Sequence, residues 1–266
     1  MPDRQHPSKF RARFLAGETL LGTFIKTPTS HTSEVVGSLG FDFVVIDEEH
    51  SPFDRGTIDH ALLGARAAGT AGIVRVSEAS AAKLLAVLDD GATGILAPHV
   101  DSAERAKEIV ACCRYRGGKR GYSNTNRGGG FGATGVWEHV DRRDAETVVI
   151  AMIEDAAALE RLDEIMAVDG LDGVFIGRGD LTVALGATGY GDPRVQGATE
   201  KIIAAARTGG KRICIMVANA AEAAQWQAFG VSGFIVSSDQ GFLRSAALKT
   251  RGEFDALVAK TSASAA

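Results

Sequence analysis

Four ionisable residues follow one apolar stretch near the start of the chain. Residues 44–46 (Val-Val-Ile) have the β-branched composition of a strand buried on both faces, and Asp47, Glu48, Glu49 and His50 come directly after them. Removing charged groups from water is costly, so folding alone does not favour such a cluster. The pattern therefore indicates either an ordinary solvated strand end or a functional site.

Similar strand ends recur along the chain. Arg75 lies in a short apolar run, Glu154 follows residues 147–153, and Asp180 follows the turn Gly-Arg-Gly at 177–179. Carboxylates at the ends of two neighbouring strands converge and repel each other unless a hard divalent cation lies between them. Glu154 and Asp180 therefore predict a site for Mg²⁺, Mn²⁺ or Co²⁺.

Three further residues suit chemistry beside such a cation. Arg75 carries a permanent positive charge that fits a substrate carboxylate or an enolate oxygen. Imidazoles titrate near neutrality, which suits His50 to proton transfer, and Asp47 could orient its ring. The set predicts removal of a proton, or cleavage of a C–C bond, next to a carbonyl. The alternative interpretation is a network of structural ion pairs.

The elements that position these residues alternate regularly. Eight short apolar strands and intervening helices over about 250 residues are typical of an α/β fold of the (β/α)8 TIM-barrel type, whose chemistry lies at the carboxyl ends of the strands. A doubly wound open sheet is the rival, but no Gly-x-Gly-x-x-Gly turn follows the first strand. The expected strands are 20–25, 44–46, 73–76, 94–98, 147–153, 173–177, 213–217 and 233–236, and the expected helices 30–39, 58–68, 80–88, 101–113, 156–168, 194–207, 219–229 and 243–259.

A long basic, glycine-rich stretch at 116–135 interrupts the alternation. Loops of this length are usually functional or mobile. An RNA-binding tract is the sharper alternative, but a short charge run in an acidic chain is weak support for it.

Bulk composition excludes several classes of protein. With 266 residues, 45% hydrophobic and 23% charged, the chain can bury a full core as one domain over 1–266. A net charge of −4 argues against nucleic-acid binding. Three cysteines form no disulfide or metal pattern, no apolar run approaches the length of a membrane span, and the N-terminus lacks a signal-peptide stretch. A cytoplasmic protein without membrane or nucleic-acid partners is expected.

The ordered motifs resemble the HpcH/HpaI family of class II pyruvate aldolases. The resemblance rests on Asp-Glu-Glu-His at 47–50, Val-Arg-Val at 74–76, Leu-Asp-Asp-Gly-Ala at 88–92, Ile-Glu at 153–154 and Phe-Ile-Gly-Arg-Gly-Asp-Leu at 175–181. These motifs lie within a core of about 20–245, in order and with plausible spacing.

This resemblance implies a metal-dependent cleavage of 4-hydroxy-2-oxo acids to pyruvate, or a related 2-oxo acid such as hydroxypyruvate, and an aldehyde. It also implies a homohexamer whose last helix is exchanged between neighbouring subunits. By matching positions, Glu154 and Asp180 would bind the metal, His50 would be the acid/base assisted by Asp47, and Asp89 would support a site across a subunit interface; substrate contacts would come from Phe24, Arg75, Gly179, Asp180 and Val217.

The chain departs from the family pattern at several positions. Met152 stands where a glutamine is usual, Phe24 where a tryptophan is common, and Arg178-Gly179 where the family turn has Pro-Ser or Pro-Ala; Arg116-Gly117 replaces a proline pair. Arg178 could add a second anion contact. These departures leave the natural substrate, the metal and the stereochemistry open.

Three other functions fit parts of the sequence. Lys26 ends the first strand and could form a Schiff base with a substrate carbonyl, in which case a chelator would not inhibit the enzyme. A barrel that binds a metabolite without turnover is a second alternative. The Arg-Gly-Asp tripeptide at 178–180 suggests adhesion, but it is common by chance and the chain shows no secretory signal.

Overall fold

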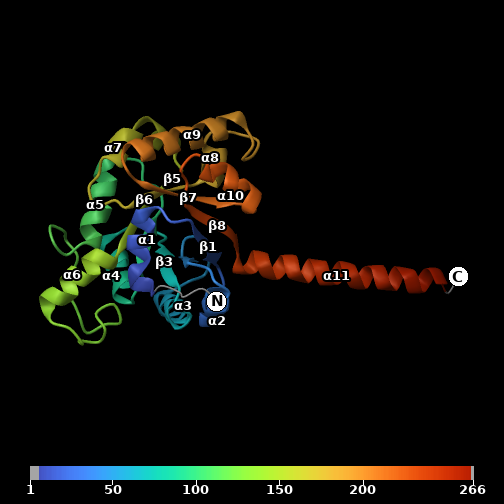
Figure 1. The fold of residues 1–266 in the computed structure, drawn as a ribbon, viewed down its shortest axis with the longest axis horizontal. Coiled ribbons are helices and arrows are strands. Elements are labelled where there is room, and N and C mark those ends of the chain that lie inside the picture. The colour runs from blue at the N-terminus through green and yellow to red at the C-terminus, as the bar shows by residue number, and fades with distance from the viewer. Residues whose placement is uncertain (1–5, 265–266) are drawn as a thin grey trace.

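The architecture is a closed barrel of eight parallel strands with helices around it (Figure 1). The computed structural model describes residues 6–264, with side chains through residue 257. Each strand pairs in parallel with its sequence neighbours, and β8 pairs with β1 to close the barrel. The strands are β1 (Leu20–Ile25), β2 (Phe43–Asp47), β3 (Ala71–Arg75), β4 (Gly94–Ala97), β5 (Val148–Ile153), β6 (Gly173–Ile176), β7 (Arg212–Val217) and β8 (Gly233–Ser238). The predicted TIM-barrel class is confirmed.

The helices lie outside the barrel and mostly follow the predicted alternation. They are α1 (Phe10–Ala16), α2 (Ser30–Ser38), α3 (Arg55–Ala67), α4 (Ala81–Asp89), α5 (Ala103–Cys113), α6 (Val136–Glu146), α7 (Leu162–Met166), α8 (Arg178–Ala184), α9 (Pro193–Thr208), α10 (Ala220–Gln227) and α11 (Asp239–Ser264), with short 3-10 turns η1 (Pro7–Lys9) and η2 (Ala156–Glu160).

Two apolar layers hold the barrel together. Because strand side chains alternate between faces, residues such as Phe24, Val45 and Phe175 pack inside the barrel, while Ile46 and Val217 pack between the strands and the helices. Both layers are buried, which explains why the strands are nearly continuous apolar runs.

The base of the barrel is closed by α1, which the sequence analysis did not predict. Phe10 and Phe14 join the inner layer, and the Phe10 ring lies 5.5 Å from that of Phe43. A Cβ on Gly173 would lie 2.6 Å from the Arg212 carbonyl oxygen and 2.7 Å from the Phe14 ring. Only glycine allows this close approach at the start of β6.

Several local predictions were wrong. Helix α2 is capped by Thr29 rather than Ser30, and α5 by Ser102 rather than Asp101, since those side chains accept the first backbone amides. The predicted helix at 156–168 is divided into η2 and α7. Helix α6 was not predicted because it follows the glycine-rich stretch, and α8 because it begins within the Gly-Arg-Gly segment at 177–179, which was interpreted as a turn.

The loop at 116–135 is pinned to the outside of the barrel. Arg127 forms two hydrogen bonds of 3.0 Å with Asp59 of α3, and the Gly128 amide donates to the Asp89 carbonyl at the end of α4. None of its residues lines the cavity described below.

Helix α11 leaves the barrel and projects away from it (Figure 1). Along it Leu243, Leu248 and Phe254 are exposed by 72%, 54% and 59%. The exchange of this helix between subunits stays a prediction. Within residues 6–264, no helix combines the length and apolar character that a bilayer crossing needs.

Candidate active site

A cavity of about 280 Å³ opens at the carboxyl ends of the strands, where barrel enzymes place their chemistry. Its lining combines charged, aromatic and hydroxyl side chains. Its lining comes from seven of the eight strands or the segments that follow them: Phe24, Lys26, His50, Arg75, Met152, Phe175, Ile176, Gly177, Arg178, Gly179, Asp180, Tyr190, Met216, Ser237 and Ser238.

Arg75 and Asp47 form the central ion pair of the cavity wall. They are paired in the register of β2 and β3, and Arg75 donates from Nε to Oδ1 (2.9 Å) and from Nη2 to Oδ2 (2.8 Å). Lys26 Nζ lies 2.7 Å from the same Oδ2. Burial alone would raise the pKa of Asp47, but the bonds and charges of Arg75 and Lys26 outweigh it and hold this pKa below its usual value.

This pairing corrects one prediction. Asp47 was expected to orient the ring of His50, but its carboxylate is occupied by Arg75 and Lys26. From His50 it accepts a hydrogen bond of the backbone amide, at 3.2 Å, and none from the ring. The His50 ring instead lies 3.7 Å from Glu49 Oε2. Asp47 thus positions Arg75, while His50 is 56% exposed in the cavity mouth.

The guanidinium of Arg75 has three further neighbours. Its Nη1 forms an ion pair with Glu49 Oε2 at 3.2 Å, without a hydrogen bond, and lies 4.0 Å from the sulfur of Met152. Its Cζ lies over the Phe24 ring, 4.9 Å from the ring centroid. Arg75 is 6% exposed and immobilised on several sides, which favours it as a preorganised anion contact.

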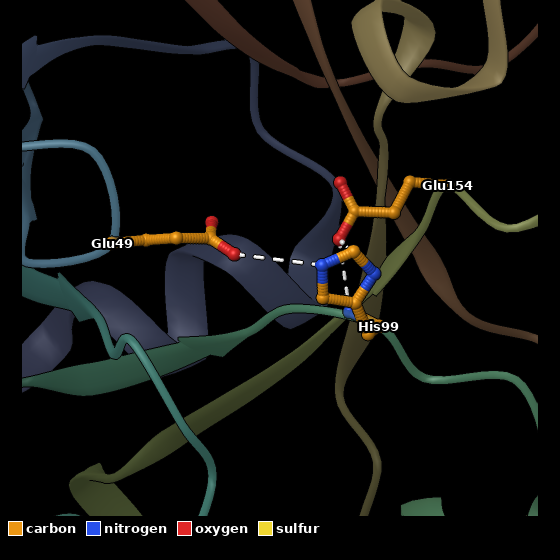
Figure 2. A group of neighbouring side chains, drawn as sticks. All are labelled: Glu49, His99 and Glu154. Carbon is orange, nitrogen blue, oxygen red and sulfur yellow. Dashed lines mark hydrogen bonds and ion pairs between the residues drawn. The ribbon is translucent and has the colours of Figure 1, made fainter. Parts of the chain in front are cut away.

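Glu49, His99 and Glu154 bring three potential metal ligands together (Figure 2). One donor atom from each lies within 4.8 Å of the other two. His99 Nε2 is 3.7 Å from Glu49 Oε1, His99 Nδ1 is 3.5 Å from Glu154 Oε1, and the His99 amide donates to that oxygen at 2.9 Å. They come from the ends of β2, β4 and β5.

The electrostatics of Glu154 fit a bound cation. The residue is 1% exposed, and burial raises the pKa of its carboxyl to about 7; Asp180 and Glu49 add to the rise, while the amide and ring of His99 oppose it. Glu49 Oε2 is buried without a hydrogen-bond partner among the described residues. A divalent cation would neutralise these crowded oxygens, so this donor set fits a metal.

Two residues at the mouth have strained backbones. His99 and Ser237 adopt φ values of 52° and 58°, in the left-handed region that disfavours side chains. Ser237 lines the cavity and His99 belongs to the carboxylate cluster. Such conformations persist where surrounding structure enforces them and concentrate at functional sites.

Most of the other predicted residues also reach the cavity. Phe24, Gly179 and Asp180 line it. Val217 does not, because the alternation of β7 turns its side chain into the outer layer and places Met216 in the cavity. Asp89 lies at the end of α4, 3.3 Å from Arg120, and is outside the cavity of its own chain.

The ammonium group of Lys26 is engaged by Asp47. A protonated amine has no lone pair with which to attack a carbonyl, so the geometry does not support the Schiff-base alternative.

Sequence reasoning missed His99, Tyr190, Met216 and the two serines of β8. His99 follows β4 by two residues, so a systematic inspection of all eight strand ends would have found it. Arg178 was noted as an anion contact, but its Nη1 forms a 2.7 Å ion pair with Glu222. That pair neutralises much of its charge.

The chain belongs to the HpcH/HpaI aldolase/citrate lyase family, which it matches over residues 20–256. The predicted family is therefore confirmed.

Individual relatives are similar over most of their length. A 5-keto-4-deoxy-D-glucarate aldolase of Klebsiella pneumoniae is 34% identical over 250 residues, 93% of this chain and 97% of that protein. A hydroxypyruvate/pyruvate aldolase of Roseobacter denitrificans is 37% identical over 210 residues, 78% and 81% of the two chains. The crystal structure of an HpcH/HpaI aldolase from Desulfitobacterium hafniense superposes with a TM-score of 0.87 at 28% identity, covering 92% of this chain and 95% of that one.

A solved structure named for a different activity is also similar to this chain. A structure of the citrate synthase SbnG superposes with a TM-score of 0.82 at 32% identity, covering 92% of this chain and 98% of that one. Similarity of sequence and fold alone therefore does not name the substrate, because function depends on the residues of the site.

Proposed function

We propose that this protein is a class II aldolase, a carbon–carbon lyase that cleaves a 4-hydroxy-2-oxo acid reversibly. The products are pyruvate, or a related 2-oxo acid such as hydroxypyruvate, and an aldehyde. The observation that carries the proposal is the crowded carboxylate cluster around buried Glu154, which lies beside the fixed guanidinium of Arg75 at one barrel mouth. The names of the two aldolase relatives support this substrate class.

The proposed cofactor is a divalent cation, Mg²⁺, Mn²⁺ or Co²⁺, held by Glu154 with Asp180 or Glu49. When bound, it supplies a Lewis acid for the oxygens of a 2-oxo acid. Asp180 lines the same cavity, and its charge acts on Glu154. Arg75, which Asp47 holds in place, contributes a positive charge for the negative charge that develops on the departing 2-oxo acid.

His50 is the proposed acid/base. It lines the cavity, and its ring is free of the ion pair that occupies Asp47. As base it takes the proton of the 4-hydroxyl group. The C3–C4 bond then breaks, C4 leaves as the aldehyde carbonyl, and the electron pair goes to C3 as the enolate of the 2-oxo acid. Protonation at C3 completes the reaction.

The proposed assembly is a homohexamer in which α11 exchanges between subunits and Asp89 supports a neighbour's site. The exposed apolar residues of the projecting α11 support a contact with another copy of the chain. A cytoplasmic location belongs to the same proposal, since the three cysteines are unpaired.

The experiment is an aldol assay with a panel of 4-hydroxy-2-oxo acids, before and after treatment with EDTA. We expect pyruvate release to be lost on chelation and restored by Mg²⁺, Mn²⁺ or Co²⁺, and Glu154→Ala to remain folded but fail to bind the metal. Full activity of the chelated enzyme, or trapping of the substrate on Lys26 by borohydride, would contradict the proposal. Saturable binding of 2-oxo acids without turnover would favour a metabolite-binding barrel.

A further inference from the structure

We propose that His99 supplies an imidazole ligand to the metal site, so that this enzyme binds first-row transition-metal ions such as Mn²⁺ and Co²⁺ in preference to Mg²⁺. The inference rests on the proposed function only in requiring a divalent cation beside Glu154. It adds a nitrogen donor to a site otherwise expected to be made of carboxylates.

The His99 ring lies close to the carboxylates of Glu49 and Glu154. His99 Nε2 faces Glu49 Oε1 at 3.7 Å, and its Nδ1 lies 3.5 Å from Glu154 Oε1 (Figure 2). Ligand atoms that share a cation at bond lengths of about 2.0–2.2 Å lie roughly 3.0–3.5 Å apart. The donor atoms of the three residues lie within 4.8 Å of one another, so sharing a cation requires them to approach by roughly 1–2 Å, and the His99 side chain, 59% exposed, has room to turn toward the two carboxylates.

The other nitrogen of the His99 ring has a carboxylate partner of its own. His99 Nδ1 lies 3.2 Å from Asp155 Oδ2. If Nδ1 carries the proton and donates it to Asp155, the lone pair of the ring is on Nε2, the atom that faces Glu49. A carboxylate that accepts from one nitrogen of a histidine while the other binds a metal is the common outer-sphere arrangement of such ligands.

The backbone at His99 supports the same role. Its φ of 52° lies in the left-handed region, which is unfavourable for a residue with a side chain. This conformation lets the amide donate to Glu154 Oε1 at 2.9 Å while the ring stands beside the same carboxylate. One residue thus orients a carboxylate ligand and places an imidazole next to it.

The consequence is a preference among metals. Carboxylates and water suit Mg²⁺, whereas an imidazole nitrogen raises affinity along the series from Mn²⁺ to Zn²⁺. Removing His99 should therefore weaken the binding of Mn²⁺ and Co²⁺ much more than that of Mg²⁺.

The test is pulsed EPR of the Mn²⁺-loaded full-length protein, which detects imidazole nitrogen bound to the metal. We expect the nitrogen modulation in the wild type, its loss in His99→Asn and His99→Gln, and its retention in the matched variant His50→Gln. Asparagine tolerates the left-handed backbone, so His99→Asn separates loss of the ring from backbone strain. By titration, Mn²⁺ affinity should fall 10–100-fold in His99→Asn while Mg²⁺ affinity changes less than threefold.

Three results would overturn the inference. Nitrogen modulation that persists without His99, or that disappears with His50 instead, would assign the signal to another residue. An equal loss of Mn²⁺ and Mg²⁺ affinity in His99→Asn would show a merely structural contact. In these cases metal-dependent activity of the wild type would still support the aldolase, whereas a wild type that binds no Mn²⁺ and ignores EDTA would remove both proposals.

Discussion

Two buried carboxylates stand at opposite ends of neighbouring strands and differ in every partner. Asp172 precedes β6 at the base of the barrel and accepts four hydrogen bonds: two from Arg11 (3.0 and 2.7 Å), one from Arg114 (3.0 Å) and one from the Val149 amide (2.9 Å). Glu154 follows β5 at the mouth and accepts one hydrogen bond, from the His99 amide, among the described residues.

Their charged surroundings are opposite as well. Asp172 is enclosed by two guanidinium groups, whereas Glu154 lies among the carboxylates of Glu49 and Asp180, which help to raise its pKa to about 7. Saturated pairing at the base indicates a structural role. The incomplete pairing of Glu154 at the mouth indicates a site that binds a positively charged ligand. Barrel enzymes usually divide the two roles in this way, with stability at the base and chemistry at the mouth.

The largest expected effect is a loss of catalytic rate when His50, at the barrel mouth, is replaced. His50→Ala should slow cleavage of a 4-hydroxy-2-oxo acid by about 10²–10⁴, the usual contribution of a positioned acid/base. The ring is largely exposed, so stability should not change. Steady-state kinetics would check this, with His60→Ala on the exposed face of α3 as the matched control. A wild-type rate in His50→Ala would transfer the role to another group at the mouth, such as His99.

The next largest expected effect is a loss of stability when Asp172, at the bottom of the barrel, is replaced. Asp172→Ala should lower the free energy of unfolding by about 2–4 kcal/mol, because it removes a buried carboxylate that holds two partly buried guanidinium groups. Metal affinity of the folded fraction should be unchanged, since Asp172 lies at the other end of the barrel. Chemical denaturation and metal titration measure the two quantities. A loss of metal affinity with little loss of stability would end the distinction drawn between the two carboxylates.

A smaller effect concerns Arg75. Arg75→Lys keeps the charge but loses the planar fork that grips Asp47, so kcat should fall roughly 10–100-fold, and further in Arg75→Ala. A group that acts mainly on the transition state changes kcat more than KM. If steady-state kinetics instead give a pure KM effect in both variants, Arg75 only holds the substrate.

The smallest effect is a pH dependence. The pKa of Glu154 is raised from an ordinary value of 4.5 to about 7 in the folded state, so its contribution to stability is fully present below pH 4.5 and is lost as the pH rises through 7. Glu154→Gln remains neutral throughout. In EDTA it should be more stable than the wild type by about 1–3 kcal/mol at pH 8, and nearly equal at pH 5. Thermal unfolding of both proteins at pH 5 and pH 8 measures this. An equal difference in stability between variant and wild type at both pH values would show that the pKa of Glu154 is not raised.

Local patterns determined the strands and the reaction class. Continuous apolar runs predict strands buried on both faces, and charged residues directly after them can only lie at the carboxyl rim of a barrel. Glu154, Arg75 and His50 were found in this way. Helix α1 was not found, because seven residues with two buried phenylalanines have too little periodicity to predict a helix that closes the base of the barrel.

The partner of each rim residue depended on the tertiary structure. The register of β2 against β3 pairs Asp47 with Arg75 and so takes Asp47 from His50, and the alternation of β7 exchanges Val217 for Met216. The left-handed turn after β4 brings His99 to Glu154 across 55 residues of sequence. Residue type and position at a strand end are local properties of the chain, so they could be predicted before the fold was known. The direction and the partner of each side chain depend on strand register and loop path, which exist only once the barrel has closed.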